Sequence, residues 1–284
     1  MNLQEIRRRI SSVKNTQKIT RAMKMVAASK LRRAQEAIRR TRPYAHNMGD
    51  LTTILASRAE PDKHPLLQPG SGGAAGLVVV TSDRGLCGGF NGNIINETMR
   101  IIHEEFAGTP VELIVVGRKG VDAFKRRNVT VCRTFPGLFD RFSVSSASSV
   151  VDDFVPRFTS GEFREVYCVY NEFKTALSQR VVLERLLPYP SLETAETPPV
   201  DYIFEPSEDQ LLFQLLVNNI YVQMYRILHE SAASEHSARM RSMDSATRNA
   251  GEIIGKLTLT YNKERQAEIT REVTEVISAA EAVG

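Results

Sequence analysis

The placement of proline and glycine constrains this chain more than any other feature of its sequence. All twelve prolines lie between Pro43 and Pro206, and fourteen of the seventeen glycines lie between Gly49 and Gly161. Residues 1–42 therefore contain neither residue type, and residues 207–284 contain no proline. Because proline and glycine end or weaken helices, the sequence predicts a long helix at each end, spanning ~63 Å and up to ~115 Å at ~1.5 Å per residue. A compact globule of this length, with a radius of gyration of ~19 Å, could not enclose them.

The head carries a heptad pattern in which eight of eleven positions are apolar: Leu3, Ile6, Ile10, Val13, Gln17, Thr20, Lys24, Ala27, Leu31, Ala34 and Ile38. This spacing by three and four predicts a helix packed along a partner helix in a left-handed supercoil. At the three consecutive polar positions, we expect the neighbouring stripe of Ile19, Met23 and Val26 to become the buried face. We expect the helix to end at Arg42-Pro43, because a residue before proline disfavours the α region.

The tail shows the same spacing, which predicts an antiparallel coiled coil with the head. Its seam residues are Met240, Met243, Thr247, Ala250, Ile254, Leu257 and Tyr261, preceded by Val217, Ile220, Met224 and Ile227 and resumed by Ile269, Val273, Val276 and Ala280. A cap with first-turn acids, Pro206-Ser207-Glu208-Asp209, marks the start of the tail helix. We expect an N-terminal coiled-coil helix over 1–60, an α/β domain over 75–190 and a C-terminal coiled-coil helix over 207–284.

The middle of the chain alternates strands and helices, the pattern of a small, Rossmann-like α/β domain. Gly70–Gly76 is interpreted as a flexible lead-in. The expected strands are 77–81, 111–116, 129–132, 165–173 and 177–187, and the expected helices are 93–106, 119–126 and 145–159. This order predicts a mostly parallel sheet whose last two strands form an antiparallel hairpin. Residues 188–206, which hold five prolines, are expected to form the linker to the tail helix.

The glycine-rich turn after the first strand does not carry a nucleotide-binding signature. Its glycines at 85, 88, 89 and 92 do not form GxGxxG, and the chain has no GxxxxGK[ST] motif. We interpret these glycines as residues of a tight turn in which Asp83 and Asn91 make local caps. Cys87 has no recognisable base, and His229 and His236 lie outside any HExxH pattern. The sequence therefore predicts no catalytic residue, no cofactor and no metal.

Charge is divided unevenly within the overall net charge of +4. Residues 1–42 hold thirteen Lys/Arg and two Glu, hence +11, whereas residues 207–284 hold eight Lys/Arg and eleven Asp/Glu, hence −3. A basic head indicates an acidic partner, which nucleic acid, a membrane surface or acidic protein loops would each supply; a solvated basic helix face is the alternative. Three scattered cysteines indicate a reducing compartment. No stretch has the length and apolarity of a membrane span or a secretory signal.

Four motifs, in order along the whole chain, resemble the gamma subunit of F-type ATP synthases. The head contains residues 19–30, ITRAMKMVAASK, and the first strand is followed by residues 82–88, SDRGLCG. The tail contains residues 234–240, SEHSARM, with Met243 and Ala246-Thr247, and then residues 261–270, YNKERQAEIT. The resemblance implies a rotor shaft that couples rotation of the membrane c-ring to conformational cycling of the catalytic alpha/beta ring. It implies no catalysis by the chain itself.

The resemblance also assigns partners. It implies contacts with the alpha, beta, delta and epsilon subunits and with the c-ring, at the cytoplasmic face of a bacterial inner membrane and without insertion into it. Met23 and Lys24 match positions opposite acidic loops of beta. Four tail residues match positions that hydrogen-bond to the ring: Arg239, Arg265, Gln266 and Thr270. The chloroplast-type cysteine insert is absent.

Two other functions would account for part of the sequence. A nucleic-acid-binding coiled coil would also be basic, but the head has no aromatic residue before Tyr44 and the tail is acidic. A dinucleotide-dependent oxidoreductase would need the phosphate-binding fingerprint that this chain lacks. Salt-dependent RNA binding would favour the first alternative, and saturable cofactor binding the second.

Overall fold

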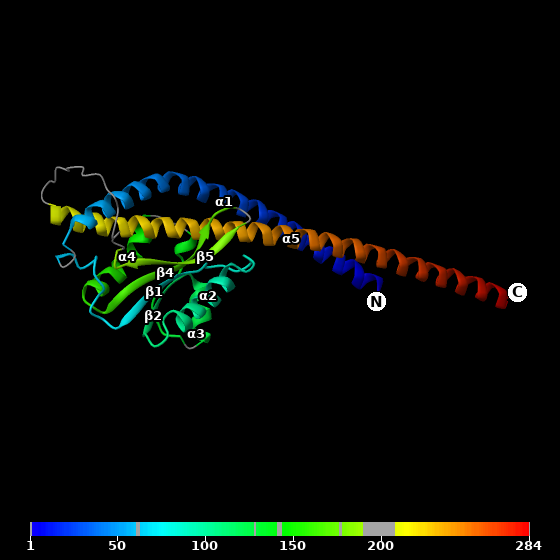
Figure 1. The fold of residues 1–284 in the computed structure, drawn as a ribbon. Coiled ribbons are helices and arrows are strands. Elements are labelled where there is room, and N and C mark those ends of the chain that lie inside the picture. The colour runs from blue at the N-terminus through cyan, green and yellow to red at the C-terminus, as the bar shows by residue number, and fades with distance from the viewer. Residues whose placement is uncertain are drawn as a thin grey trace. The chain divides into compact units, whose positions relative to one another are not determined.

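A computed structural model describes residues 2–60, 63–127, 129–140, 144–175, 178–189 and 208–283 (Figure 1). Two long helices, α1 (Leu3–Arg58) and α5 (Glu208–Val283), flank the sheet elements in the sequence. Between them lie β1 (Ala74–Val80), α2 (Phe90–Glu104), β2 (Val111–Val116), α3 (Arg118–Arg126), β3 (Val131–Phe135), the 3₁₀ turn η2 (Leu138–Asp140), α4 (Val144–Thr159), β4 (Phe163–Phe173) and β5 (Gln179–Leu187). The predicted fold class, a five-stranded α/β sheet with long N- and C-terminal helices, is confirmed. Most of the predicted linker, from residue 190 on, lies outside the described residues.

The sheet has the order β3-β2-β1-β4-β5. β1 pairs in parallel with β2 and β4, β2 pairs in parallel with β3, and β4 pairs antiparallel with β5, which confirms the predicted final hairpin. Leu77–Val80 are buried, as are the last four residues of β2, Leu113–Val116, because parallel strands are covered on both faces. Their near-continuous Val, Leu and Ile runs therefore identified both strands from the sequence.

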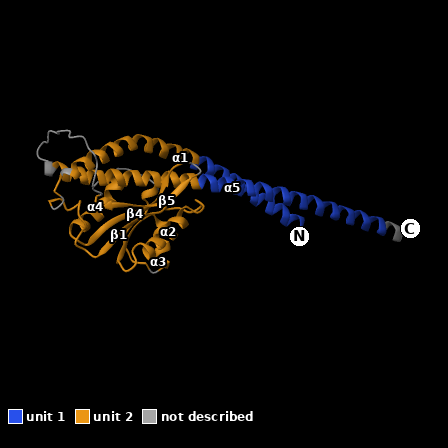
Figure 2. Cartoon of the chain, viewed as in Figure 1, with its two compact units in different colours: residues 1–27, 239–284 blue, residues 28–238 orange. Residues whose placement is uncertain are grey.

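The chain divides into two compact units, coloured separately in Figure 2. Unit 1 contains residues 1–27 and 239–284, and unit 2 contains residues 28–238. Unit 1 holds the start of α1 and the end of α5. Unit 2 holds the sheet with its helices, together with the remainder of α1 and the first part of α5. The three-part division expected from the sequence, 1–60, 75–190 and 207–284, stays a prediction.

The predicted helix end at Arg42-Pro43 is wrong, because α1 continues through Pro43 to Arg58. Proline removes one backbone hydrogen bond from a helix interior, but packing continues on the same face beyond it. Ala45, Thr52 and Leu55, which extend the spacing by three and four, are all buried. The apolar face thus outweighs the local cost of the proline.

The glycines before β1 do not form the flexible lead-in that was expected from the sequence. Gly70 N donates a hydrogen bond to Arg164 O at 2.9 Å, and a Cβ on Gly70 would lie 2.1 Å from Phe163 O. A Cβ on Gly72 would lie 2.2 Å from Gly161 O. These residues are glycine because the backbone passes directly against the start of β4.

Candidate partner interface

In unit 1 the two helices run antiparallel and meet through a layer of polar side chains. Thr20 Oγ1 lies 2.8 Å from Thr247 Oγ1, and Gln17 Nε2 donates to Thr247 O at 3.3 Å. Lys24 Nζ lies 2.6 Å from Asp244 Oδ1, and this pairing lowers the pKa of the Asp244 carboxyl. Each polar residue of the predicted seam therefore has a partner on the facing helix.

The expectation that Ile19, Met23 and Val26 replace this polar layer is wrong. Ile19 is 60% exposed and Val26 58% exposed, while Met23 is half-buried. The seam keeps its spacing through the polar positions because their hydrogen bonds and ion pair are made within the layer. The Ile19–Val26 stripe is consequently left on the outside of α1 in unit 1, beside the basic side chains of the head.

The pairing of the helices also fixes where the seam ends on α5. A Cβ on Gly251 would lie 3.1 Å from Gln17 Nε2. Together with the Thr20–Thr247 and Lys24–Asp244 pairs, this contact sets a register in which Leu3 faces a residue near 265. Beyond Tyr261, every described side chain of α5 is exposed.

The predicted continuation of the seam beyond residue 268 is therefore wrong within this chain. Ile269, Val273 and Val276 are 51%, 53% and 68% exposed, and Ile277 is 53% exposed. The side chain of Ala280 lies outside the described ones. Because α1 begins at Leu3, which faces a residue near 265, it does not reach these residues, and their apolar side chains are not covered by the described part of unit 1.

The predicted partner-binding residues fall into separate groups. Lys24 is paired with Asp244, whereas Arg265 lies 21 residues further along α5, roughly 31 Å at 1.5 Å per residue. Arg265, Gln266 and Thr270 are exposed and share one stretch of helix, where Thr270 Oγ1 donates to Gln266 O at 2.9 Å. Arg239, the first tail residue of unit 1, is half-buried. The structure thus places Lys24 and the Arg265 group at two distinct levels of the helix pair.

The glycine-rich turn of unit 2 is closed by a carboxylate of its own. Asp83 Oδ1 accepts from Arg118 N at 3.1 Å and from Gly137 N at 2.8 Å, and Asp83 Oδ2 accepts from Phe139 N at 3.1 Å. The prediction that Asp83 makes a local cap is wrong, because it joins the turns that follow three strands. Its carboxylate occupies the start of α3, where a phosphate would otherwise meet free N–H groups.

Asn91 does bond locally, as predicted. Its Oδ1 accepts from Ser82 N at 2.9 Å, and its Nδ2 donates to Cys87 Sγ at 3.2 Å. Cys87 is buried, and Leu86 beside it has φ 65 with its side chain 64% exposed. The tight-turn interpretation therefore accounts for this segment.

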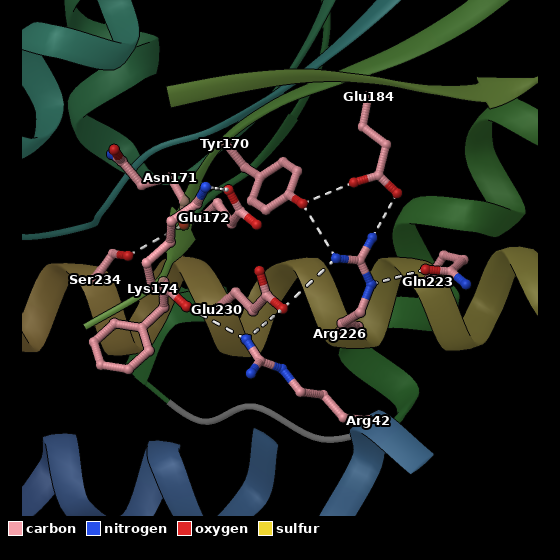
Figure 3. A network of polar contacts seen from close by, with 11 residues as sticks. Arg42, Tyr170, Asn171, Glu172, Lys174, Glu184, Gln223, Arg226, Glu230 and Ser234 are labelled. Atoms are coloured by element: carbon pink, nitrogen blue, oxygen red, sulfur yellow. Dashed lines mark hydrogen bonds and ion pairs between the residues drawn. The ribbon is translucent and has the colours of Figure 1, made fainter. Parts of the chain in front are cut away.

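A polar network that no sequence pattern predicted is centred on Arg226 of α5 (Figure 3). Arg226 donates to Glu184 Oε1 of β5 at 2.5 Å, to Tyr170 OH of β4 at 3.2 Å and to Gln223 Oε1 at 2.8 Å. Tyr170 OH donates to Glu184 Oε2 at 2.7 Å. One guanidinium thereby joins α5 to two strands.

Glu230, one turn further along α5, extends this network to α1. Its Oε1 lies 3.6 Å from Arg226 Nη1 and 3.4 Å from Arg42 Nη2, and Arg42 Nη2 also donates to Phe173 O at 3.3 Å. Burial raises the pKa of Glu230 despite these two arginines, and it lowers the pKa of the neighbouring His229. An open cleft of about 810 Å³, lined in part by Arg42, Arg226 and Glu230, lies beside the network.

The part of the chain that the structure describes contains no cluster of three or more His, Cys, Asp or Glu side chains suited to a metal ion. Among the same residues, no helix combines the length and apolarity needed to cross a membrane.

The chain matches known proteins over its whole length. The family model described as ATP synthase matches residues 2–283. The ATP synthase gamma chain of Geobacter metallireducens is 47% identical over 286 residues, and that of Anaeromyxobacter sp. (strain Fw109-5) is 46% identical over 293 residues; in both comparisons 99% of each chain is covered.

Solved structures agree on the fold. A chain in the Euglena gracilis mitochondrial ATP synthase (OSCP/F1/c-ring) superposes with a TM-score of 0.72 at 19% identity, covering 99% of this chain and 94% of that one. A chain in the central stalk and c-ring structure of the Tetrahymena thermophila enzyme gives a TM-score of 0.61 at 26% identity, covering 80% of this chain and 99% of that one. By the family model and its full-length relatives, this chain belongs to the ATP synthase gamma chain family.

Proposed function

We propose that this chain is the central rotor shaft of an F-type, proton-translocating ATP synthase, with no catalysis of its own. The observation that carries the proposal is the end of α5 in unit 1, where Ile269, Val273, Val276 and Ile277 are all more than half exposed. These residues are spaced by three and four and therefore form one apolar face, and a helix with such a face open to water is stabilised by burial against partners. Full-length similarity to gamma chains supports other ATP synthase subunits as those partners.

The proposed partners are the alpha, beta, delta and epsilon subunits and the membrane c-ring. Two structural neighbours support this choice, since one is a chain of a central stalk and c-ring and the other a chain of an F1/c-ring assembly. Met23 and Lys24 belong to a basic face that suits acidic loops of beta. The relatives give no support to the nucleic-acid-binding alternative.

Arg239, Arg265, Gln266 and Thr270 are proposed to hydrogen-bond to the alpha/beta ring. The last three are exposed on α5 in unit 1, and we refer to Arg265, Gln266 and Thr270 as the tail polar set. Charge-assisted hydrogen bonds contribute roughly 1.5–3 kcal/mol each. The tail polar set would thus hold the shaft in register with the surrounding ring.

Coupling would follow from the asymmetry of the shaft. A paired helix resists bending and twisting better than a single one, and each turn of it presents a different face to each catalytic subunit. Contacts that favour one subunit conformation over another shift its population. Rotation would therefore change the state of the catalytic sites, while ATP chemistry stays in the ring. The chain would work at the cytoplasmic face of the bacterial inner membrane as a peripheral subunit.

Purification from membranes at native abundance tests the assignment. The chain should travel with a complex that contains several larger ATP-binding subunits, and a bead attached to it should rotate when ATP is supplied. Purification with RNA, in a salt-dependent manner and without those subunits, would overturn the assignment and favour the nucleic-acid alternative.

A further inference from the structure

The segment 227–238 of α5 is buried on nearly every side within unit 2. Eleven of its twelve residues are buried, and His236 is half-buried. Small side chains, among them Ala232, Ala233 and Ala238, make this close packing possible. Contacts between such small apolar surfaces are non-directional, so by themselves they would oppose rotation of α5 about its own axis only weakly.

Directional contacts to the sheet lie along one line of the same helix. Arg226, Glu230 and Ser234 are spaced by four residues, which places them on one face. Arg226 bonds to Tyr170 and Glu184, as described above. Eight residues further on, Ser234 Oγ donates to Asn171 O at 3.2 Å, and Gln179 Nε2 donates to Ser234 O at 2.8 Å. The helix is thus tied to β4 and β5 at two levels.

Between these levels, Glu230 joins the line to α1. Its side chain is 4% exposed, and its Oε1 faces both Arg42 and Arg226. Arg42 in turn donates to the carbonyl of Phe173 at the end of β4. Rotation of α5 against the sheet would pull this row off its partners and leave buried charges unpaired, which is costly.

We propose that Arg226, with Glu184, Tyr170, Glu230 and Arg42, is a torsional lock that prevents α5 from turning against the sheet under load. This inference rests on the proposed rotor function, because only a chain that carries torque needs such a lock. α5 is one continuous helix over Glu208–Val283. Torque applied to the helix would pass to the α/β domain through these off-axis, directional contacts.

The test uses the whole ATP synthase complex in lipid vesicles. The main variant combines Arg226→Met, Glu184→Gln and Glu230→Gln, which neutralises the network without leaving a lone buried charge. Arg226→Lys keeps the charge but loses the planar fork that hydrogen-bonds to Glu184, Tyr170 and Gln223. Arg157→Met is the matched control, because the Arg157 side chain is 21% exposed against 19% for Arg226. Arg157 also pairs with a carboxylate, Glu112, at 2.6 Å and lies over the ring of Phe163. None of these partners belongs to α1 or α5.

The measured quantity is the ratio of gradient-driven ATP synthesis to ATP hydrolysis. A merely structural defect leaves fewer intact complexes and lowers both rates in proportion, whereas a slipping helix affects the loaded reaction more. We expect the ratio to fall about threefold or more in the triple variant, within the range for coupled buried networks. Arg226→Lys should lower it less, and Arg157→Met should leave it at the wild-type value.

An unchanged ratio in the triple variant would overturn the lock. If that variant does not assemble, Arg226→Lys decides the question, and a wild-type ratio there would overturn the lock equally. Failure of the proposed function would look different, because the wild-type complex itself would then show no synthesis or hydrolysis dependent on this chain.

Discussion

Two stretches of α5 reverse the usual relation between polarity and burial. In unit 2, eleven of the twelve residues of the segment 227–238 are buried, although six of these eleven are polar: His229, Glu230, Ser231, Ser234, Glu235 and Ser237. In unit 1, the described side chains of the segment 262–279 are all exposed, although the segment carries Ile269, Val273, Val276 and Ile277. Burial along this helix therefore follows the partners that the chain itself supplies, and not hydrophobicity.

The two stretches have different physical roles, one in folding and the other in assembly. Polar groups in the buried segment, such as Glu230 and Ser234, reach α1 or the sheet, so their bonds are made when the chain folds. Apolar groups in the exposed segment can be covered only when another molecule arrives. Substitutions in the first stretch should therefore act on stability, and those in the second on assembly.

The largest effect is expected from Arg226→Met in the purified chain. The substitution leaves the half-buried Glu184 and the buried Glu230 without their shared arginine. Removing one partner of a fully buried pair costs ~3–5 kcal/mol, so the loss should reach up to that range. Denaturant unfolding measures this loss. Lys24→Met in unit 1, where both partners are partly exposed, should lower the free energy of unfolding far less. Equal losses of unfolding free energy in the two variants would mean that the polar contacts of unit 2 contribute no more to stability than those of unit 1.

Replacing an alanine by leucine should destabilise the buried stretch more than the exposed one. Ala233 is fully buried, so Ala233→Leu forces atoms into a filled space and should destabilise the chain by ~1–3 kcal/mol. Ala267 is exposed, and Ala267→Leu should change the free energy of unfolding by no more than ~0.5 kcal/mol. The two denaturant midpoints provide the measurement. A tolerated leucine at 233 would contradict the close packing of α5 in unit 2.

The tail polar set should show the opposite behaviour. Arg265→Ala with Gln266→Ala should leave the stability of the free chain nearly unchanged, because both side chains are exposed. In the complex, loss of two hydrogen-bonding groups should weaken assembly and slow ATP hydrolysis by about an order of magnitude or more. The control is Arg271→Ala, which is expected to matter less. If the double variant assembles and turns over like the wild type, the proposed role of the tail polar set is wrong, but the rotor-shaft function is not contradicted.

Acid should weaken unit 2 through His229. Burial lowers the pKa of this histidine in the folded chain, so the stability it contributes is present above its unfolded pKa of about 6.5 and is lost as the pH falls through the folded value. The raised pKa of Glu230 acts in the opposite sense, since its contribution is present below its unfolded value and is lost as the pH rises through the folded one. The His229→Gln variant isolates the first effect.

The free energy of unfolding, measured from pH 8 to pH 5, should fall less steeply below ~6.5 in His229→Gln than in the wild type, by no more than ~1.4 kcal/mol per pH unit for one proton. Identical slopes would show that His229 does not stay neutral in the folded chain.

Spacing in the sequence was sufficient to predict most of the fold. The alternation by three and four identified Ile6, Ala27, Leu31, Ala34 and Ile38 as buried. Short apolar runs gave all five strands. The pattern was less reliable where tertiary partners decide the outcome, as at Pro43, where continued packing keeps the helix intact.

The polar contacts within unit 2 were less accessible to sequence reasoning. Arg42, Tyr170, Glu184, Arg226 and Glu230 come together from four elements, and nothing in a single sequence marks which distant charges will meet. Asp83 was assigned to a local cap for the same reason, because its three backbone donors are at least 35 residues away. The residues assigned through family resemblance came from matched motifs, since exposed polar side chains leave no periodic signal.

The smallest effect on stability, and the most specific one, is expected in the polar layer of unit 1. Thr20 and Thr247 pair through their hydroxyls at 2.8 Å. Replacing both by valine keeps their shape and removes both partners, so the free energy of unfolding should change by no more than ~0.5 kcal/mol or rise.

Polar residues in a helical seam also specify register, and apolar replacements should permit the helices to slip by one heptad. Cysteines introduced at Gln17 and Gly251 report the native register, since a Cβ on Gly251 lies 3.1 Å from Gln17 Nε2. Cysteines at Gln17 and Thr258 report a shift of one heptad. The wild-type layer should cross-link only the first pair, whereas Thr20→Val with Thr247→Val should yield both. If the valine variant cross-links only the native pair, the apolar positions alone set the register and the polar layer has no such role.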